Sequence, residues 1–183
     1  MKLKKAWRNM LLCTGFAAFT GVMAQLEIPL PLIPISGQTL AVGLSATVLG
    51  SLRGASAMII YAGMGVAGLP VFAGGASGWE VVSGTSGGYI LGFIPAAYLI
   101  GLLIERKGIQ LTTAIYANLV GTALILLCGM IQLQSLLDLS WSEALKAGVI
   151  PFLPVGIIKA LLAAYFGVLI QKKGRNSPLR KTA

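Results

Sequence analysis

The sequence contains no histidine, two cysteines and only five acidic residues among its 183. Cys13 and Cys128 both stand inside long apolar runs, where a lone cysteine behaves as a small hydrophobic residue. Without histidine, and without the motifs CxxC, HExxH or GxSxG, the chain lacks the groups that zinc chemistry or nucleophilic catalysis requires. We therefore expect neither an enzyme nor a resident metal or cofactor.

A phosphate-binding loop of the form GxxxxGK[ST] is also missing, so the chain cannot use ATP by itself, and any active process needs a motor from another subunit. The formal charge of +9 raises the question of nucleic acid binding. The basic residues, however, stand mostly in flanking clusters with no RNA-binding signature nearby, which argues against a nucleic acid partner.

Charged residues make up only 10% of the chain and hydrophobic residues 56%, whereas soluble domains average about 25% charged residues. A bilayer is therefore the expected solvent. A spanning helix needs roughly 20 apolar residues, and six stretches meet or approach that length. We predict an all-α polytopic membrane protein with one domain over residues 1–183 and six transmembrane helices at about residues 6–26, 38–52, 54–69, 87–104, 111–133 and 149–170.

The distribution of charge predicts the orientation of these helices. Residues 38–69 could form one helix with Arg53 at its centre, but a charge there costs several kcal/mol, and five crossings would place one basic end outside. Six crossings put both termini in the cytoplasm together with twelve of the fourteen basic residues. A cleaved signal peptide ending near Ala24 is the alternative for the first helix, and it would break this parity. We thus expect a multi-pass protein of the cell membrane.

Residues 27–38 join the first two predicted helices and contain Pro29, Pro31 and Pro34. Each proline removes an amide donor and fixes φ, so this segment is predicted to be extended and stiff. An apolar segment at the outer face needs something to cover, which favours a flap over a substrate cavity. The alternative is a simple connector.

Residues 70–89 contain six glycines, which allow the backbone to approach a ligand closely. Irregular backbone near membrane depth is tolerated only where protein buries it or where it lines a cavity. We therefore predict that this segment lines a site, with Ser77 as a polar group and Phe72, Trp79 and Tyr89 as flat apolar walls. Trp79 and Tyr89 are equally consistent with an aromatic belt at the membrane interface.

Lys159 falls near the middle of the last predicted helix. A lysine buried in a membrane is costly and marks a functional site, and no predicted helix offers it an acidic partner. A substrate carboxylate is the partner we favour, and snorkelling toward the outer surface is the alternative. Small residues four apart, such as Ala17 and Gly21, favour close helix packing, and the pair in the first helix could also serve a partner protein.

These residues resemble the BioY family, the biotin-specific S components of energy-coupling factor (ECF) transporters, along nearly the whole chain. The resemblance is carried by Pro29-Leu30-Pro31 leading to Gln38-Thr39-Leu40-Ala41-Val42, by Gly68-Leu69-Pro70-Val71-Phe72-Ala73-Gly74-Gly75, by Gly84-Thr85-Ser86-Gly87-Gly88-Tyr89-Ile90-Leu91-Gly92-Phe93, and by Pro151-Phe152-Leu153-Pro154 followed by Lys159.

The resemblance implies a six-helix S-component bundle with an outward-facing pocket that the loop after the first helix closes. It also implies a partner module of one transmembrane scaffold subunit and two ATPase subunits, with biotin as the transported substrate. In the family, the lysine that matches Lys159 is associated with biotin binding. This agrees with the independent prediction that Lys159 pairs with a substrate carboxylate.

One position departs from the family pattern, which is commonly Pro-Gly-Asp-x-x-Lys. Here Pro154 is followed two residues later by Gly156, so the acceptor for a ureido N–H of biotin is missing. Ser77, Gln38 or Asn118 could accept that hydrogen instead. Alternatively, the ligand is a biotin precursor or another small carboxylate.

Two other kinds of protein stay open at this point. A membrane interaction protein would use the glycine-rich segment and Lys159 only for packing. A solitary secondary carrier would move biotin or a related carboxylate without an ATPase.

Overall fold

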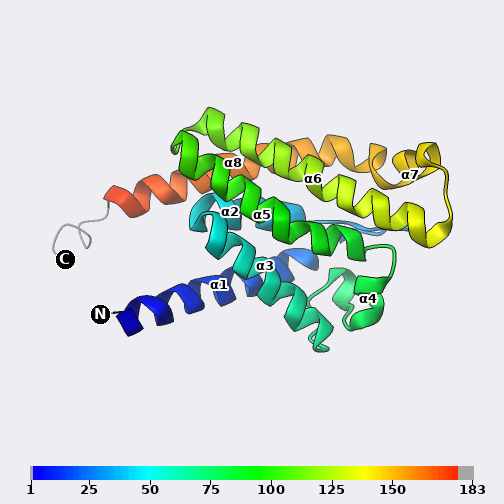
Figure 1. Cartoon of the computed structure of the whole chain (residues 1–183), viewed down its shortest axis with the longest axis horizontal. Helices are drawn as coiled ribbons and strands as arrows, with labels where there is room; N and C mark the ends of the chain where they lie inside the picture. The colour runs from blue at the N-terminus through cyan, green and yellow to red at the C-terminus, as the bar shows by residue number, and fades with distance from the viewer. Residues whose placement is uncertain (1, 177–183) are drawn as a thin grey trace.

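The computed structural model describes residues 2–176, and its long helices form one bundle along the longest axis of the molecule (Figure 1). These helices are α1 (Lys2–Ala24), α2 (Gln38–Leu49), α3 (Ser51–Val66), α5 (Gly87–Lys107), α6 (Leu111–Leu137) and α8 (Leu153–Asn176). Three segments, Gly87–Lys107, Leu111–Leu137 and Trp141–Lys173, are long and apolar enough to cross a bilayer by length and composition. The predicted all-α bundle of six helices is confirmed.

The two ends of the bundle differ. Helix α1 begins and α8 ends at one end, which also carries the α2–α3 and α5–α6 connections, and we call it the termini end (Figure 1). The opposite end carries the strands β1 (Glu27–Ile28) and β2 (Ile35–Ser36) and the short helices α4 (Trp79–Ser83) and α7 (Trp141–Gly148), and we call it the hairpin end.

Helix α8 begins four residues later than predicted. Pro151 lies in a 3₁₀ turn, η2 (Ile150–Phe152), and because proline has no N–H the preceding residues do not join a regular α-helix. Lys159 consequently stands in the second turn of α8, close to the hairpin end. Our placement of this lysine near the middle of the last helix is wrong.

Helices α2 and α3 are two helices and not one, because the chain breaks at Gly50, whose φ is +85°. The carboxylate of Glu105 accepts hydrogen bonds from the Ser51 amide at 2.8 Å and from the Ser51 hydroxyl at 2.7 Å. It thereby satisfies a free donor at the start of α3. Arg53 lies in the first turn of α3 and is exposed, so it does not sit in a membrane centre.

The proline-containing segment is not helical, as predicted, but it is extended only at its ends. These ends form an antiparallel hairpin in which Glu27 pairs with Ser36 and Ile28 with Ile35, and residues 31–33 bend between them. The glycine-rich segment is less irregular than predicted, because it contains α4 and a 3₁₀ turn, η1 (Ala73–Gly75). Helix α7 was not predicted, although its capping box, Ser140 with Glu143, is readable in the sequence.

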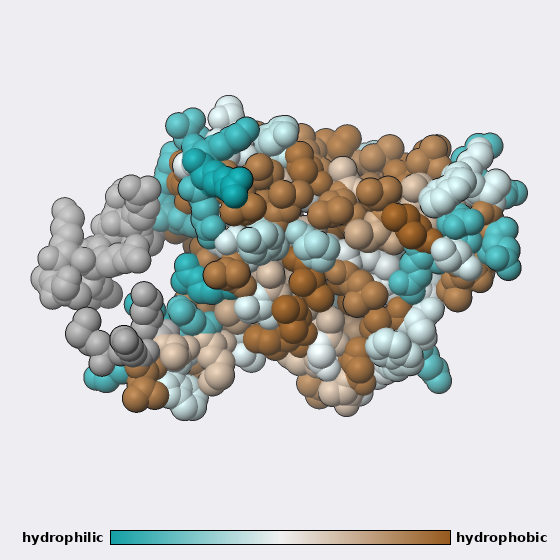
Figure 2. Space-filling model, in the orientation of Figure 1, coloured by the Kyte–Doolittle hydropathy of each residue, from teal (hydrophilic) through white to brown (hydrophobic). Residues whose placement is uncertain are grey.

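Small residues pack the helices together, while large apolar side chains cover the outside. Ala46, Ala57, Ala96 and Ala163 are fully buried. On the face shown in Figure 2, apolar side chains cover the middle of the bundle, and hydrophilic residues gather toward its ends. This pattern is typical of a protein whose helices contact lipid, since lipid offers no hydrophobic driving force and close packing depends on small residues.

The close approach of α5 to the α2–α3 break predicts a measurable change in stability. A Cβ at Gly101 of α5 would overlap backbone atoms of Gly50 and Ser51, which cannot move without opening the α2–α3 break. We expect Gly101→Ala to destabilise the protein by about 1–3 kcal/mol, measured as a lower midpoint of thermal unfolding in detergent. Gly63→Ala is the matched control, because nothing lies within 4 Å of its added methyl group. Equal midpoints for the two variants would contradict the close packing at Gly101.

Candidate substrate-binding site

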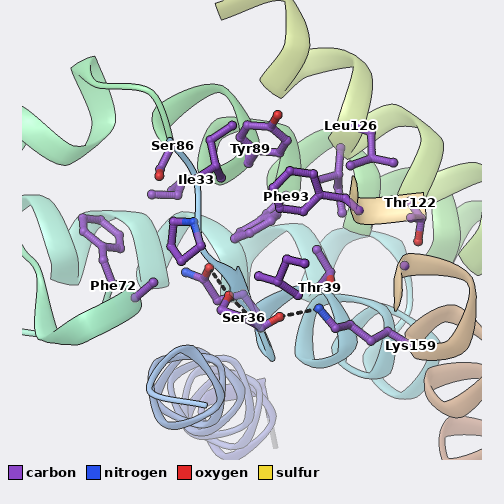
Figure 3. Close-up of a pocket in the computed structure, with 18 of the residues that line it drawn as sticks. Ile33, Ser36, Thr39, Phe72, Ser86, Tyr89, Phe93, Thr122, Leu126 and Lys159 are labelled. Atoms are coloured by element: carbon purple, nitrogen blue, oxygen red, sulfur yellow. Dashed lines mark hydrogen bonds between the residues drawn. The ribbon is translucent and has the colours of Figure 1, made fainter. Parts of the chain in front are cut away.

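A cavity of about 180 Å³ lies at the hairpin end, between the hairpin, the glycine-rich segment and helices α2, α5, α6 and α8 (Figure 3). Apolar side chains form most of its wall. The lining residues are Ile33, Pro34, Ile35, Ser36, Gln38, Thr39, Phe72, Ala73, Ala76, Val81, Ser86, Tyr89, Ile90, Phe93, Thr122, Ile125, Leu126, Phe152, Gly156 and Lys159.

Helical spacing brings the wall residues of α5 and α6 to the cavity. On α5 and its N-cap, Ser86, Tyr89, Ile90 and Phe93 follow the i, i+3, i+4, i+7 pattern, which places them on one helix face. On α6, Thr122, Ile125 and Leu126 repeat the first part of that pattern. The two helices pack closely against each other, so their faces meet at one wall of the cavity.

Among the described residues that line the cavity, Lys159 is the single charged one, and none carries a carboxylate. Its ammonium nitrogen donates a hydrogen bond of 2.6 Å to the backbone carbonyl of Ser36 at the end of β2 (Figure 3). The side chain is half-buried and points toward the hairpin instead of out along α8. One carbonyl satisfies one of three ammonium donors, so the site can still accept an anion.

A series of buried side chains continues from Ser36 away from the cavity. The Ser36 hydroxyl donates to Oε1 of Gln38 at 2.6 Å, and the Gln38 amide nitrogen donates to the Tyr61 hydroxyl. The Tyr61 hydroxyl in turn donates to the carbonyl of Val71 at 3.0 Å. We call Ser36, Gln38, Tyr61 and the Val71 carbonyl the buried chain of hydrogen bonds.

Four of the seven site residues predicted from the sequence line this cavity, namely Lys159, Gln38, Phe72 and Tyr89. Phe72 is 1% exposed and packs edge-on against Tyr61. The Tyr89 ring stacks obliquely on Phe152, and its hydroxyl donates to the Gly148 carbonyl at 2.7 Å. The Tyr89 hydroxyl is therefore engaged by α7, and it is the ring that borders the cavity.

The other three predicted residues lie outside the cavity. Asn118 is buried between helices, where its amide donates to the Thr47 hydroxyl and to the Ala114 carbonyl. Trp79 begins α4 and is 66% exposed, a position typical of an interfacial tryptophan. Ser77 precedes α4 without reaching the cavity wall. We leave these three residues out of the proposed site.

Several lining residues were missed from the sequence, above all Thr39, Ser86 and Thr122. None of their hydroxyls donates a hydrogen bond within residues 2–176, so all three can serve a ligand. Thr122 faces Gly156, because a Cβ on that glycine would lie 3.2 Å from the Thr122 methyl group. The helical spacing of Ser86 with Tyr89 was the available signal, but nothing in the sequence shows that Thr122 faces Gly156.

Within the described residues, no three side chains of histidine, cysteine, aspartate or glutamate come together in a way that could hold a metal ion. The cavity therefore offers apolar walls, a few neutral hydroxyl groups and one cation. Such a site can bind a small apolar molecule that carries a negative charge.

The fold and the cavity define a membrane protein of the S-component type. A crystal structure of the S component for biotin from an ECF-type ABC transporter superposes with a TM-score of 0.86 at 22% identity, covering 94% of this chain and 95% of that one. This similarity establishes the fold and confirms the predicted S-component bundle.

The chain belongs to the BioY family, whose family model matches residues 1–176. The biotin transporter BioY2 of Lactococcus lactis subsp. cremoris is 38% identical over 93% of both chains. The biotin transporter BioY of Thermotoga maritima is 34% identical over 90% of this chain and 96% of its own length. These names describe transport and not catalysis, so the prediction that the chain is no enzyme is confirmed.

Proposed function

We propose that the protein captures biotin from outside the cell and delivers it inward as the S component of an ECF transporter. The observation that carries this proposal is the single cation, Lys159, in a mostly apolar cavity whose described lining residues include no carboxylate. Biotin combines a compact ring head with a chain that ends in a carboxylate. The BioY transporters that resemble this chain are named for the same vitamin.

In the proposed complex the biotin carboxylate pairs with the Lys159 ammonium, and the aromatic wall of Phe72, Tyr89 and Phe93 packs against the apolar part of the ligand. The hydroxyl groups of Thr39, Ser86 and Thr122 remain for the polar ring head. A hydroxyl donates and accepts, so it can serve either a ureido N–H or the ureido carbonyl. Binding and release change no covalent bond and need no cofactor.

Gly156 leaves a second ligand class open within the same function. Where the family commonly has an aspartate, this wall presents a bare backbone beside Thr122, so recognition of the ring head depends on neutral groups. Neutral hydrogen bonds discriminate less than charge-assisted ones. A biotin precursor that keeps the carboxylate is therefore the second candidate ligand.

The distribution of charge supports an orientation with the hairpin end outside and both termini in the cytoplasm. The termini end carries the basic residues Lys4, Arg8, Arg53, Arg106, Lys107, Lys172 and Lys173, whereas Glu27, Glu80, Asp138 and Glu143 belong to the hairpin end. Basic residues concentrate in cytoplasmic loops of membrane proteins. The cavity then opens toward the side from which a vitamin arrives.

The proposed partners are a transmembrane scaffold subunit and two ATPase subunits. The chain contains no phosphate-binding loop, so it depends on other subunits for energy. Its fold is that of an S component, a class of subunit found in ECF-type transporters. ATP hydrolysis by the partners would drive reorientation of the S component and release of biotin inside.

Lys159→Ala and biotinamide together test the proposed ion pair. We expect wild-type protein to bind biotin tightly and Lys159→Ala to weaken binding about 10- to 100-fold, the 1.5–3 kcal/mol typical of a charge-assisted hydrogen bond. Biotinamide replaces the carboxylate with a neutral amide, so it should bind the wild type weakly and lose little more in the variant. Calorimetric titration of the purified protein measures all four affinities.

Lys146→Ala is the matched control, because it removes an exposed lysine from α7 at the same end of the molecule and should leave biotin affinity unchanged. Equal losses of biotin and biotinamide in Lys159→Ala would mean that the lysine supports the cavity wall and does not read the carboxylate. If desthiobiotin or another precursor binds the wild type more tightly than biotin, the second candidate ligand is correct.

Uptake into cells tests the proposed ATP dependence. Cells that express the chain together with the scaffold and ATPase subunits should stop accumulating labelled biotin when ATP is depleted while the proton gradient is preserved. The same cells with an inactive ATPase provide the control. Accumulation that follows the proton gradient and not ATP would identify a solitary secondary carrier instead.

A further inference from the structure

We propose that Tyr61, which does not line the cavity, is a positioning residue for the binding site. It fixes the position of the Ser36 carbonyl, which accepts the hydrogen bond from the Lys159 ammonium. This inference rests on the proposed function, since it concerns how the same cation is aimed at its ligand. Tyr61 is 0% exposed in α3 and is separated from Lys159 by the remainder of the buried chain of hydrogen bonds.

The donors and acceptors of the buried chain fix one another. A tyrosine hydroxyl has one hydrogen, and that of Tyr61 goes to the Val71 carbonyl at 3.0 Å. Tyr61 can therefore only accept from Gln38, so the amide nitrogen of Gln38 must face Tyr61 and its Oε1 must face Ser36. The Ser36 hydroxyl then donates to that oxygen at 2.6 Å.

Ser36 is the point at which this arrangement reaches the ligand. Its hydroxyl belongs to the buried chain, while its backbone carbonyl accepts the 2.6 Å hydrogen bond from Lys159 (Figure 3). Ser36 is 7% exposed and Gln38 8% exposed, so water cannot readily replace either partner. A buried donor or acceptor that loses its partner costs free energy. Removal of the Tyr61 hydroxyl is therefore expected to disturb every hydrogen bond of the buried chain, including those of Ser36.

The buried chain also joins separate walls of the cavity. It begins in the hairpin at Ser36, whose carbonyl holds Lys159 of α8, and it ends on Val71 beside the wall residue Phe72. The ring of Tyr61 packs edge-on against Phe72, with 5.6 Å between ring centroids. Loss of the Tyr61 hydroxyl thus removes a hydrogen bond from the Val71 side of the cavity and one from the hairpin side. The Tyr61 ring still fills the core.

Gln38 takes a different role from the one that the sequence suggested. Its Oε1 accepts from Ser36 and its amide nitrogen donates to Tyr61, so both ends of the amide are already engaged. Gln38 borders the cavity but acts through Ser36 and Tyr61. The group that hydrogen-bonds to the ring head of the ligand is therefore expected among the hydroxyls that line the cavity.

Tyr61→Phe removes the hydroxyl and keeps the ring, and it is the variant that tests this proposal. In the otherwise wild-type chain in lipid nanodiscs, we expect biotin to bind about tenfold more weakly, as for one misplaced hydrogen bond. In the Lys159→Ala background, Tyr61→Phe should weaken binding by less than about twofold, because the group that it positions is gone. A residue with a merely structural role would cause the same loss in both backgrounds, and that result would overturn the proposal.

A second readout needs no ligand. Exchange of the backbone amides of residues 27–37 with deuterium should become faster in both Tyr61→Phe and Lys159→Ala, because each releases Ser36. Thr20→Val is the matched control, since Thr20 is equally buried but donates only to the Phe16 carbonyl within its own helix. It should change neither hairpin exchange nor biotin affinity.

The two readouts separate failure of this inference from failure of the proposed function. If wild-type protein binds no biotin, the proposed function is wrong, and the exchange of the hairpin amides still decides whether Tyr61 positions Ser36. If biotin binds and Tyr61→Phe alters neither affinity nor exchange, the inference alone is wrong. Should Tyr61→Phe not fold, Ser36→Ala breaks the same series at a smaller side chain and is expected to give the same dependence on Lys159.

Discussion

The hydrogen bond between the Lys159 ammonium and the Ser36 carbonyl is the interaction on which the site depends. A cation in an apolar cavity is costly unless partners surround it, and a single carbonyl provides only part of what an ammonium group can bind. The cation is thus held in place and incompletely satisfied. Because Ser36 ends the hairpin, the same bond ties the strands over the cavity to α8.

The rest of the bundle serves to hold this arrangement. Proline restricts φ in the connection between β1 and β2, and the Thr85 hydroxyl donates to the Leu32 carbonyl at 2.8 Å, which attaches the connection to the start of α5. Small residues allow the helices to approach closely, which keeps Phe93 and Thr122 at fixed positions on the cavity wall. The hairpin is therefore fixed at both its tip and its base.

Hydropathy and charge were sufficient to predict the bundle, and they marked Lys159, which does line the cavity. Both inferences depend on local chemistry, because a long apolar run must cross a bilayer and a lysine inside such a run is costly. That Lys159 binds the ligand stays a prediction. The contacts between distant segments were not predictable in the same way. Asn118 resembles a ligand-reading residue in sequence, yet α2 and α6 bury it against Thr47, and no local pattern shows that pairing.

The glycine-rich segment illustrates the same limit. Its composition indicated close approach of the backbone, and Phe72 does reach the cavity wall, but Trp79 starts a short helix and faces outward. Thr122 and Gly156 are more than thirty residues apart and meet only because α6 and α8 pack together. Only the folded chain shows which polar groups remain for a ligand.

A crystal structure of the protein with biotin bound tests the central claim most directly. The account predicts a carboxylate oxygen of biotin about 2.7–2.9 Å from the Lys159 nitrogen, the distance of a charge-assisted hydrogen bond, with the ring head among the hydroxyls of Thr39, Ser86 and Thr122. Biotin bound with its carboxylate away from Lys159, and Lys159 still bonded to Ser36 alone, would contradict it.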